Sequence, residues 1–533
     1  MLSRDKKWKK KTRKRFDTQA AEPNHSSKEP PVSSQPELLS ENLQSNLEIL
    51  TSIFKADECL TIKHLYGEDQ TLLSALVYLQ ALSDHVKIQL ILSKLADLLS
   101  KVSLDYQTHA QAVFIETKNH ALTAGNSEET DHFEALVTAL LDGNTIILLA
   151  GIKQGLIFET EINTGRKITE SDAQPLIRGP KDSFVEELER NIFMIRKRLK
   201  DTRFTIENYH LGKISKTKVA VVYLKGIANE ELLTEVRARL AMIDTDAILE
   251  SGYLEEYIED TTNTPFPTVI NTERPDMIVG CLLEGRVALL VDGTPFALLV
   301  PAVLIHFFQT AEDYYQRSWV SSAIRLLRYL GFSITLYLPA LYIALTTFHQ
   351  EVLPTPLLIS IAAQREGIPF PAFIETLLME VSFEILHEAG IRMPRTIGPA
   401  ISIVGALVLG QAAVEAGLVS AFIIIVVAMT ATCSFLIPHY ELALTVRILR
   451  FLMMFLAASF GLYGLFIGTM LLMIHLCNLH SFGIPYTSPL APYIPADQKD
   501  TLIRFPHWAL TFRPRQMKTG NQRRSRNPNR RKS

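Results

Sequence analysis

The sequence predicts an α/β soluble N-terminal region of two similar subdomains, followed by an all-α multi-span membrane domain. Residues 397–476 are the most apolar part of the chain and carry few charges, and a bilayer core takes about 20 apolar residues to cross. The polar part before them alternates short apolar runs with segments of helical spacing, which is typical of α/β structure. Two of its features recur at nearly the same offset, which indicates an internal duplication.

The duplication involves a strand and the turn before a hairpin. The apolar run around Tyr78 is matched by the run around Tyr223. Leu140-Leu141-Asp142-Gly143 is matched by Leu282-Leu283-Glu284-Gly285, and each precedes a hairpin pattern. We expect one subdomain over residues 38–170 and a second over residues 171–317, which begins with a linker and a helix around residues 178–200. Chance recurrence of short apolar runs is the alternative explanation.

Residues 1–37 are predicted to be a disordered basic tail. A dense cluster of Lys and Arg surrounds Trp8, and a stretch rich in Ser, Pro and Glu follows it. Such a composition buries too little apolar surface to fold. The cluster either adheres to anionic lipid headgroups or is a solvated tail that only enforces a cytoplasmic orientation. A nucleic-acid partner is not expected, because no nucleic-acid-binding motif follows the cluster.

The sequence contains no catalytic constellation. It has no nucleophile elbow, Walker loop, HExxH motif or paired Cys and His ligands. Its four cysteines, Cys59, Cys281, Cys433 and Cys477, form no CxxC pair, which argues against a disulfide scaffold or a zinc site. We therefore expect a binding or assembly role, with no catalytic residue, cofactor or metal. Residues 296–308 are too short to span a membrane and are interpreted as a hairpin strand with a short surface helix.

About four membrane spans are predicted within a membrane domain over residues 318–485. They cover residues 326–348, 395–414, 418–437 and 451–476. Arg325 and Arg328 precede the first span. An even number of spans places both termini on one side, and basic clusters near each end favour the cytoplasm for both. Arg447 and Arg450 conflict with this count, which a re-entrant segment or a fifth crossing would resolve.

Residues 486–533 are predicted to be a cytoplasmic C-terminal segment with a basic tail. The residues of that tail are Arg523, Arg524, Arg526, Arg530, Arg531 and Lys532.

The second predicted span has one face of small residues and an opposite face of larger ones. The small face, which allows close helix packing, consists of Gly398, Ser402, Ala406 and Gly410. The opposite face consists of Val404, Leu407, Val408 and Gln411. Apolar constrictions can gate channels by dewetting, so this opposite face is predicted to line the narrow part of a conduction path. Packing against lipid is the alternative.

Residues 371–390 are predicted to form an amphipathic helix. Its acids Glu380, Glu384 and Glu388 are four residues apart and therefore lie on one stripe. Acids beside a membrane are costly unless they are hydrated or paired. Three interpretations remain open: a solvated face, the acidic lining of an ion path, or partners for Arg392, Arg395 or another subunit.

Several motifs of the chain are those of a known family. They are Arg178-Gly179-Pro180, Arg196-Lys197-Arg198, Ala311-Glu312-Asp313-Tyr314-Tyr315, Pro339-Ala340-Leu341-Tyr342, Arg392-Met393-Pro394, Gly410-Gln411-Ala412-Ala413-Val414, Ala491-Pro492-Tyr493 and Arg504-Phe505-Pro506-His507-Trp508. Over residues 38–514 the chain resembles the A subunit of the GerA family, the spore germination receptors of endospore-forming bacteria.

The resemblance implies a multi-pass subunit in the spore inner membrane. Its partners would be a transporter-like B subunit that binds the nutrient and a lipoprotein C subunit. Copies of the A subunit would form a homo-oligomer, a nutrient-gated ion channel whose cation release starts germination. A non-conducting scaffold that couples a sensing subunit to a separate channel is the first alternative. A secondary transporter is the second, although transporters usually show repeats within the membrane, whereas here the repeat is in the soluble half.

Overall fold

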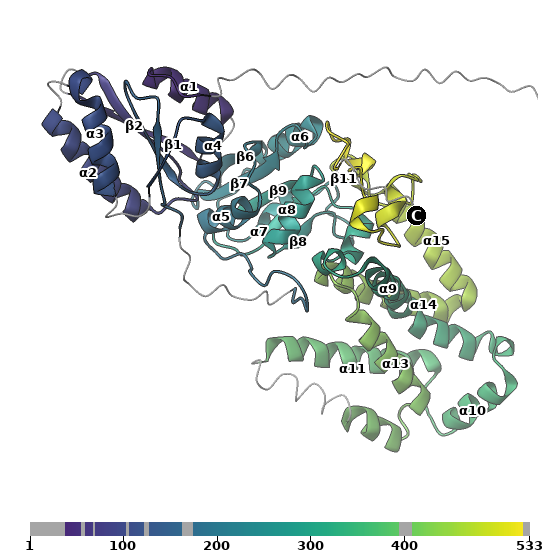
Figure 1. Ribbon diagram of the computed structural model, residues 1–533. Helices are drawn as coiled ribbons and strands as arrows, with labels where there is room; N and C mark the ends of the chain where they lie inside the picture. The colour runs from purple at the N-terminus through teal and green to yellow at the C-terminus, as the bar shows by residue number, and fades with distance from the viewer. Residues whose placement is uncertain are drawn as a thin grey trace, which may run out of the picture.

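The computed structural model describes residues 38–54, 59–67, 70–102, 106–121, 127–162, 174–393 and 408–525. Figure 1 shows two α/β subdomains in chain order, then a helical region, with the C-terminal segment packed where the second subdomain meets the helices. The predicted basic tail, residues 1–37, lies outside the described residues, as do residues 526–533 of the second basic tail.

The first subdomain is a five-stranded antiparallel sheet with helices on both faces. Its strands lie in the order β1-β2-β4-β5-β3. The elements are α1 (Leu43–Ile53), β1 (Leu60–Tyr66), β2 (Leu72–Leu79), α2 (His85–Val102), α3 (Tyr106–Ala121), β3 (Ser127–Thr130), α4 (Phe133–Leu141), β4 (Thr145–Leu149) and β5 (Gly155–Phe158).

The second subdomain repeats this plan. Its antiparallel strands lie in the order β6-β7-β9-β10-β8, so each strand has the same rank and place as its counterpart in the first sheet. The elements are α5 (Leu188–Arg198), β6 (Phe204–Leu211), β7 (Thr217–Leu224), α6 (Glu230–Ala241), α7 (Ser251–Ile258), β8 (Ile270–Thr272), α8 (Pro275–Leu283), β9 (Val287–Val291) and β10 (Ala297–Val300).

The two tyrosines that indicated the duplication occupy equivalent strands. Tyr78 on β2 pairs with Thr61 of the edge strand, and Tyr223 on β7 pairs with Thr205. Both side chains are buried in the core formed with the helix pair that follows their strand, α2 and α3 for the first sheet and α6 and α7 for the second. The prediction of a repeated sheet is therefore confirmed.

The helical region shares its core with the α/β subdomains. One continuous cluster of buried apolar residues runs from Leu39 through both sheets to Tyr486 beyond the last long helix. The elements are η1 (Leu304–Phe308), η2 (Ala311–Tyr314), α9 (Ser318–Thr347), η3 (Gln350–Val352), α10 (Thr355–Arg365), α11 (Ala372–Arg392), α13 (Ala421–Ser434), α14 (Tyr440–Phe460) and α15 (Leu462–Asn478). The C-terminal segment adds β11 (His480–Ser481), β12 (Ile484–Pro485), η4 (Asp497–Asp500), η5 (His507–Ala509) and η6 (Arg515–Met517).

Within the described residues, two helices are long and apolar enough to cross a membrane, α9 and α14. The helices α13 and α15 are apolar but shorter, at 14 and 17 residues. Most of the second predicted span, residues 395–407, lies outside the described residues. The helix predicted over residues 371–390 is α11, which packs against α13 and α9.

Three sequence predictions need correction here. The fourth predicted span is two helices, because α14 begins earlier, at Tyr440, and the chain turns sharply at Gly461. The first predicted span begins at Ser318, so Arg325 and Arg328 lie inside the helix instead of before it. The short helix after β10 is not a surface helix, since Ile305, Phe307 and Phe308 of η1 are all buried.

Gly461 makes the turn between α14 and α15 possible. Its φ of 63° and ψ of −139° are strained for any residue with a Cβ. A Cβ at this position would lie 2.7 Å from Cε1 of His349 and 2.9 Å from Cβ of Phe348. We expect Gly461→Ala to lower the free energy of unfolding by about 1–3 kcal/mol. This loss would be measured as a lower midpoint of thermal unfolding of the purified chain. Gly367→Ala, where an added Cβ meets nothing within 4 Å, is the matched control; equal midpoints would contradict the assignment.

Candidate functional site

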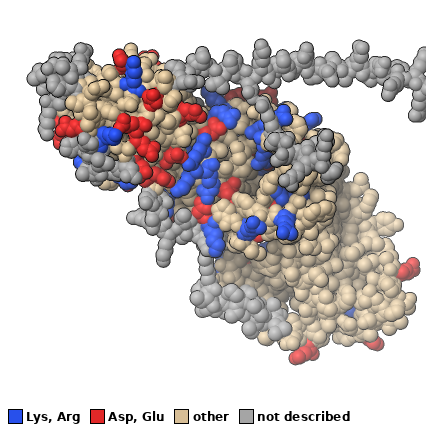
Figure 2. All heavy atoms as spheres, viewed as in Figure 1, with Lys and Arg blue, Asp and Glu red and all other residues tan. Residues whose placement is uncertain are grey.

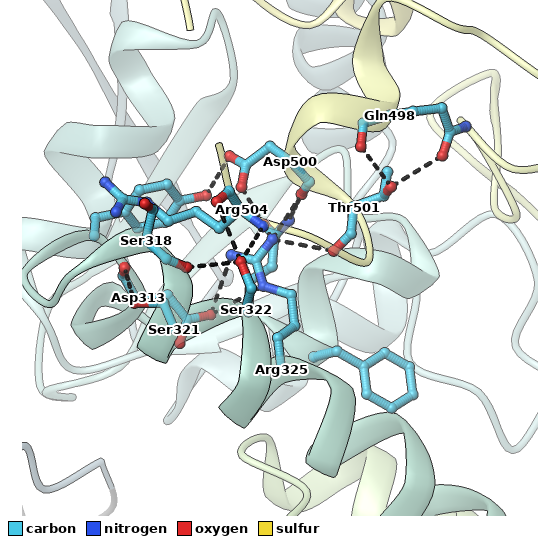
Figure 3. Close-up of polar contacts among 12 residues, drawn as sticks. Asp313, Ser318, Ser321, Ser322, Arg325, Gln498, Asp500, Thr501 and Arg504 are labelled. Atoms are coloured by element: carbon cyan, nitrogen blue, oxygen red, sulfur yellow. Dashed lines mark hydrogen bonds and ion pairs between the residues drawn. The ribbon is translucent and has the colours of Figure 1, made fainter. Parts of the chain in front are cut away.

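The N-terminal end of α9 is held by a buried network of charged side chains. Figure 3 shows Arg325 of α9 between Asp313 of η2 and Asp500 of the C-terminal segment. Arg325 is fully buried, and Asp313 is 3% exposed. Buried charges persist only when they are paired and hydrogen-bonded, so this network ties together three parts of the chain.

All three guanidinium nitrogens of Arg325 donate hydrogen bonds. Its Nε and Nη2 donate to Oδ2 of Asp313, at 3.2 and 3.1 Å. Its Nη1 donates to the carboxylate and the backbone carbonyl of Asp500, both at 2.9 Å, and to the carbonyl of Thr501 at 3.0 Å. The planar fork of arginine suits such multiple contacts.

A second arginine of α9 completes the charge balance. Nη1 of Arg328 donates to Oδ2 of Asp313 at 2.9 Å and to the carbonyl of Phe308 at 2.9 Å. The hydroxyl of Tyr314 donates to Oδ2 of Asp500 at 2.7 Å. Two arginines of α9 therefore face two aspartates.

The C-terminal segment makes a further contact with α9 one turn away. The backbone N–H of Arg504 donates to Oγ of Ser322 at 3.1 Å, and the guanidinium of Arg504 lies over the ring of Tyr314. Burial raises the pKa of the Tyr314 hydroxyl well above its ordinary value, so this group stays a hydrogen-bond donor to Asp500. The arrangement offers no nucleophile or base; it mechanically joins α9 to the α/β subdomain and the C-terminal segment.

The acidic stripe of α11 faces arginines of α14, which are not the partners predicted from the sequence. Oε2 of Glu380 lies 3.1 Å from Nη1 of Arg450, and Oε1 of Glu384 lies 2.6 Å from Nη2 of the same arginine. Glu380 and Arg450 are both fully buried. Of the two arginines predicted as partners, Arg392 pairs with the exposed Glu388 at 2.6 Å, and Arg395 lies outside the described residues.

These ion pairs explain the positions of Arg447 and Arg450, the two arginines that conflicted with the predicted number of spans. Arg447 and Arg450 lie in the middle of α14, and both face Glu384, with Arg447 at 3.9 Å. Arg450 is paired closely inside the helical region and Arg447 only loosely, and both are buried, so neither is a guide to which side of a membrane it faces. In the single chain, Glu388 is the member of the stripe that is half exposed, and the role of the stripe in an ion path stays a prediction.

The predicted pore-lining face is only partly described. Val404 and Leu407 lie outside the described residues, as do Gly398, Ser402 and Ala406 of the small-residue face. Residues 408–415 are helical, with Val408 56% exposed and Gln411 exposed. Gly410 is buried toward Ile424 of α13. In the described part, Gly410 of the small face is packed and Val408 and Gln411 of the larger face are exposed; the place of that larger face in a pore stays a prediction.

Residues 48–516 match the family described as Bacillus/Clostridium GerA spore germination protein. The chain is 44% identical to spore germination protein KA of Bacillus subtilis (strain 168) over 480 residues, which cover 90% of this chain and 87% of that protein. It is 42% identical to spore germination protein GerLA of Bacillus cereus, over 73% of this chain and 79% of that protein.

A crystal structure of the N-terminal domain of the A subunit of the Bacillus megaterium spore germinant receptor GerK3 is also similar. It shares 34% identity, covers 50% of this chain and 97% of that domain, and has a TM-score of 0.39. The match of the family over nearly the whole described chain, together with relatives of this identity, shows that the chain belongs to the GerA family of spore germination proteins.

Proposed function

We propose that the chain is the membrane subunit of a nutrient-responsive spore germination receptor and that it oligomerises into a nutrient-gated ion channel. The observation that carries this proposal is that the outer surface of the helical region is apolar, in a chain that belongs to this family. Large apolar side chains on α14 and α15 are exposed, among them Phe455 at 60%, Phe466 at 65% and Leu471 at 59%. A surface of this kind needs lipid or another subunit to cover it.

The distribution of charge supports the same placement. Figure 2 shows Lys, Arg, Asp and Glu over the α/β subdomains, whereas the helical region in this view is almost free of charge. Both arginines in the middle of α14 are instead buried, and Arg450 is paired with Glu380 and Glu384. The chain would be multi-pass in the spore inner membrane, with both termini in the cytoplasm, beside a transporter-like B subunit and a lipoprotein C subunit.

The open face of residues 408–415 supports a conducting role. Since Gly410 packs inward and Val408 points out of the single chain, copies arranged around an axis would bring their Val408 side chains together. A ring of such side chains forms an apolar constriction. The paired acids of α11 would then support the wall, and cations would be released when the constriction opens.

Conductance of the purified full-length chain in planar bilayers tests this proposal. We expect single-channel currents, and we expect Val408→Ala to raise the background current. The substitution removes two methyl groups, which corresponds to about 1.6 kcal/mol of apolar burial or roughly tenfold in the closed-to-open equilibrium.

Val352→Ala is the control, because Val352 is similarly exposed on η3 outside this face. A chain that inserts and assembles but conducts nothing would identify a scaffold instead. Coupled uptake of a solute without unitary currents would identify a transporter.

A further inference from the structure

A cavity of about 540 Å³ lies where the second α/β subdomain meets the helical region. Met277 of α8 and Ile391 of α11 form part of its wall, and Phe435 and Ile437 come from the segment between α13 and α14. The volume is within the range of small-molecule sites, about 300–1,000 Å³. The wall is largely apolar, so the few polar groups that reach it decide what it can hold.

Two buried arginines line this cavity. Arg447 enters from α14 and is 6% exposed, and Arg274 precedes α8 and is 2% exposed. The Nε of each has no hydrogen-bond partner. Arg274 is otherwise held by the carbonyl of Pro180 and the carboxylate of Asp276. A buried charged donor without an acceptor costs more free energy than a neutral one, so an acceptor bound in the cavity would stabilise both side chains.

Of the two arginines, Arg447 has the longer ion-pair contact among the described residues. Its contact with Glu384 is 3.9 Å long, and that carboxylate makes its close contact, 2.6 Å, with Arg450. Among the described residues that line the cavity there is no Asp or Glu. The described part of the wall therefore supplies no acidic group that holds Arg447 closely, whereas Arg274 is paired with Asp276, which does not line the cavity.

Two histidines also line the cavity. His439 is buried, and burial lowers its pKa to about 4, so the ring is neutral at neutral pH. His387 lines the cavity too, and its Nε2 has no hydrogen-bond partner. Arg447 and Arg274 are therefore the charged hydrogen-bond donors of the cavity, with His387 as a further polar contact.

We infer that this cavity binds the phosphate group of an anionic phospholipid, with Arg447 and Arg274 as its anchors. Guanidinium groups recognise phosphate through paired N–H donors. The exposed Ile391, Phe435 and Tyr440 extend from the cavity to the outside and provide an apolar path for an acyl chain. A soluble phosphate compound would have no use for that path.

The depth of the cavity agrees with a lipid headgroup. Arg447 lies seven residues after the first residue of α14, which is about 10 Å along the helix axis. Basic pockets between membrane helices are known to hold anionic headgroups. This inference rests on the membrane placement in the proposed function, but it requires no conduction.

Binding of a fluorescent phosphatidylglycerol to the full-length chain, purified in detergent, tests the inference. We expect saturable binding and a loss of about tenfold to a hundredfold in affinity for Arg447→Gln, because one charged hydrogen-bonding group is removed. The control is Arg317→Gln, which removes the same charge from an exposed residue at the N-terminal end of α9 and is expected to change nothing.

A second variant, at an exposed residue, tests the same cavity without changing a buried side chain. Ile391→Glu changes an exposed residue and places a negative charge at the mouth of the cavity, so it should also weaken phosphatidylglycerol binding. Unchanged affinity in both variants would overturn the inference. Displacement of the lipid by millimolar inorganic phosphate, with equal affinity for phosphate alone, would assign the cavity to a soluble phosphate and overturn the lipid.

Separate measurements test the proposed function and the lipid site. Recovery of the wild-type chain in the membrane fraction and its currents in planar bilayers test the function, whereas binding in detergent tests the cavity. A conducting chain with no phosphatidylglycerol site would leave the function standing and remove this inference.

Discussion

Arg325→Gln is expected to release the C-terminal segment from α9. The side chain is fully buried and makes hydrogen bonds to Asp313, Asp500 and Thr501. Removing one partner of a buried charge network costs about 3–5 kcal/mol, because the other charges are left uncompensated. We expect a loss of this size in the free energy of unfolding and faster proteolysis within residues 486–525.

The same variant tests the mechanical role of this network. If η2 and the C-terminal segment transmit changes in the α/β subdomains to α9, germination controlled by the receptor should be lost even where some chain reaches the membrane. Arg317→Gln, at an exposed arginine immediately before the same helix, should lie within about 0.5 kcal/mol of wild type. Wild-type protease resistance of the C-terminal segment in Arg325→Gln would show that the network does not hold it.

Arg450→Gln is expected to have the second largest effect. It removes the cation that Glu380 and Glu384 share and leaves the buried carboxylate of Glu380 without its partner. The expected cost is again about 3–5 kcal/mol, seen as a lower thermal unfolding midpoint in detergent and less chain in the membrane. Arg392→Gln, whose pair with Glu388 is exposed, should cost no more than about 1 kcal/mol.

A double-mutant cycle separates pairing from mere loss of charge. If Glu380 and Arg450 act as a pair, Glu380→Gln combined with Arg450→Gln should cost less than the sum of the two single changes. Additive costs would indicate that the acids of α11 have another role, and their contribution to an ion path would then have to be measured with all three glutamates replaced by glutamine.

The part of the fold that depends on local pattern could be predicted from the sequence. The apolar runs and turn residues around Tyr78 and Tyr223 predicted equivalent strands, and the structure has them in two sheets of one order. The helix over residues 371–390 and its acidic stripe also followed from spacing alone. The family motifs predicted membership of the GerA family, which the comparisons confirm.

The partners of the charged side chains could not be predicted in this way. Arg325 meets Asp500 across 175 residues, and Arg450 meets Glu384 across 66. Periodicity reports only contacts within a helix or strand, so Arg447 and Arg450 looked like the flank of a span instead of the middle of one. The end of α14 at Gly461 was hidden for the same reason, since a uniformly apolar run carries no sign of where it turns. By itself the sequence determined the repeated sheets, the helix over residues 371–390 and the family. The tertiary structure alone decided where the apolar helices begin and end and which buried charges pair, because both depend on contacts between segments far apart in the chain.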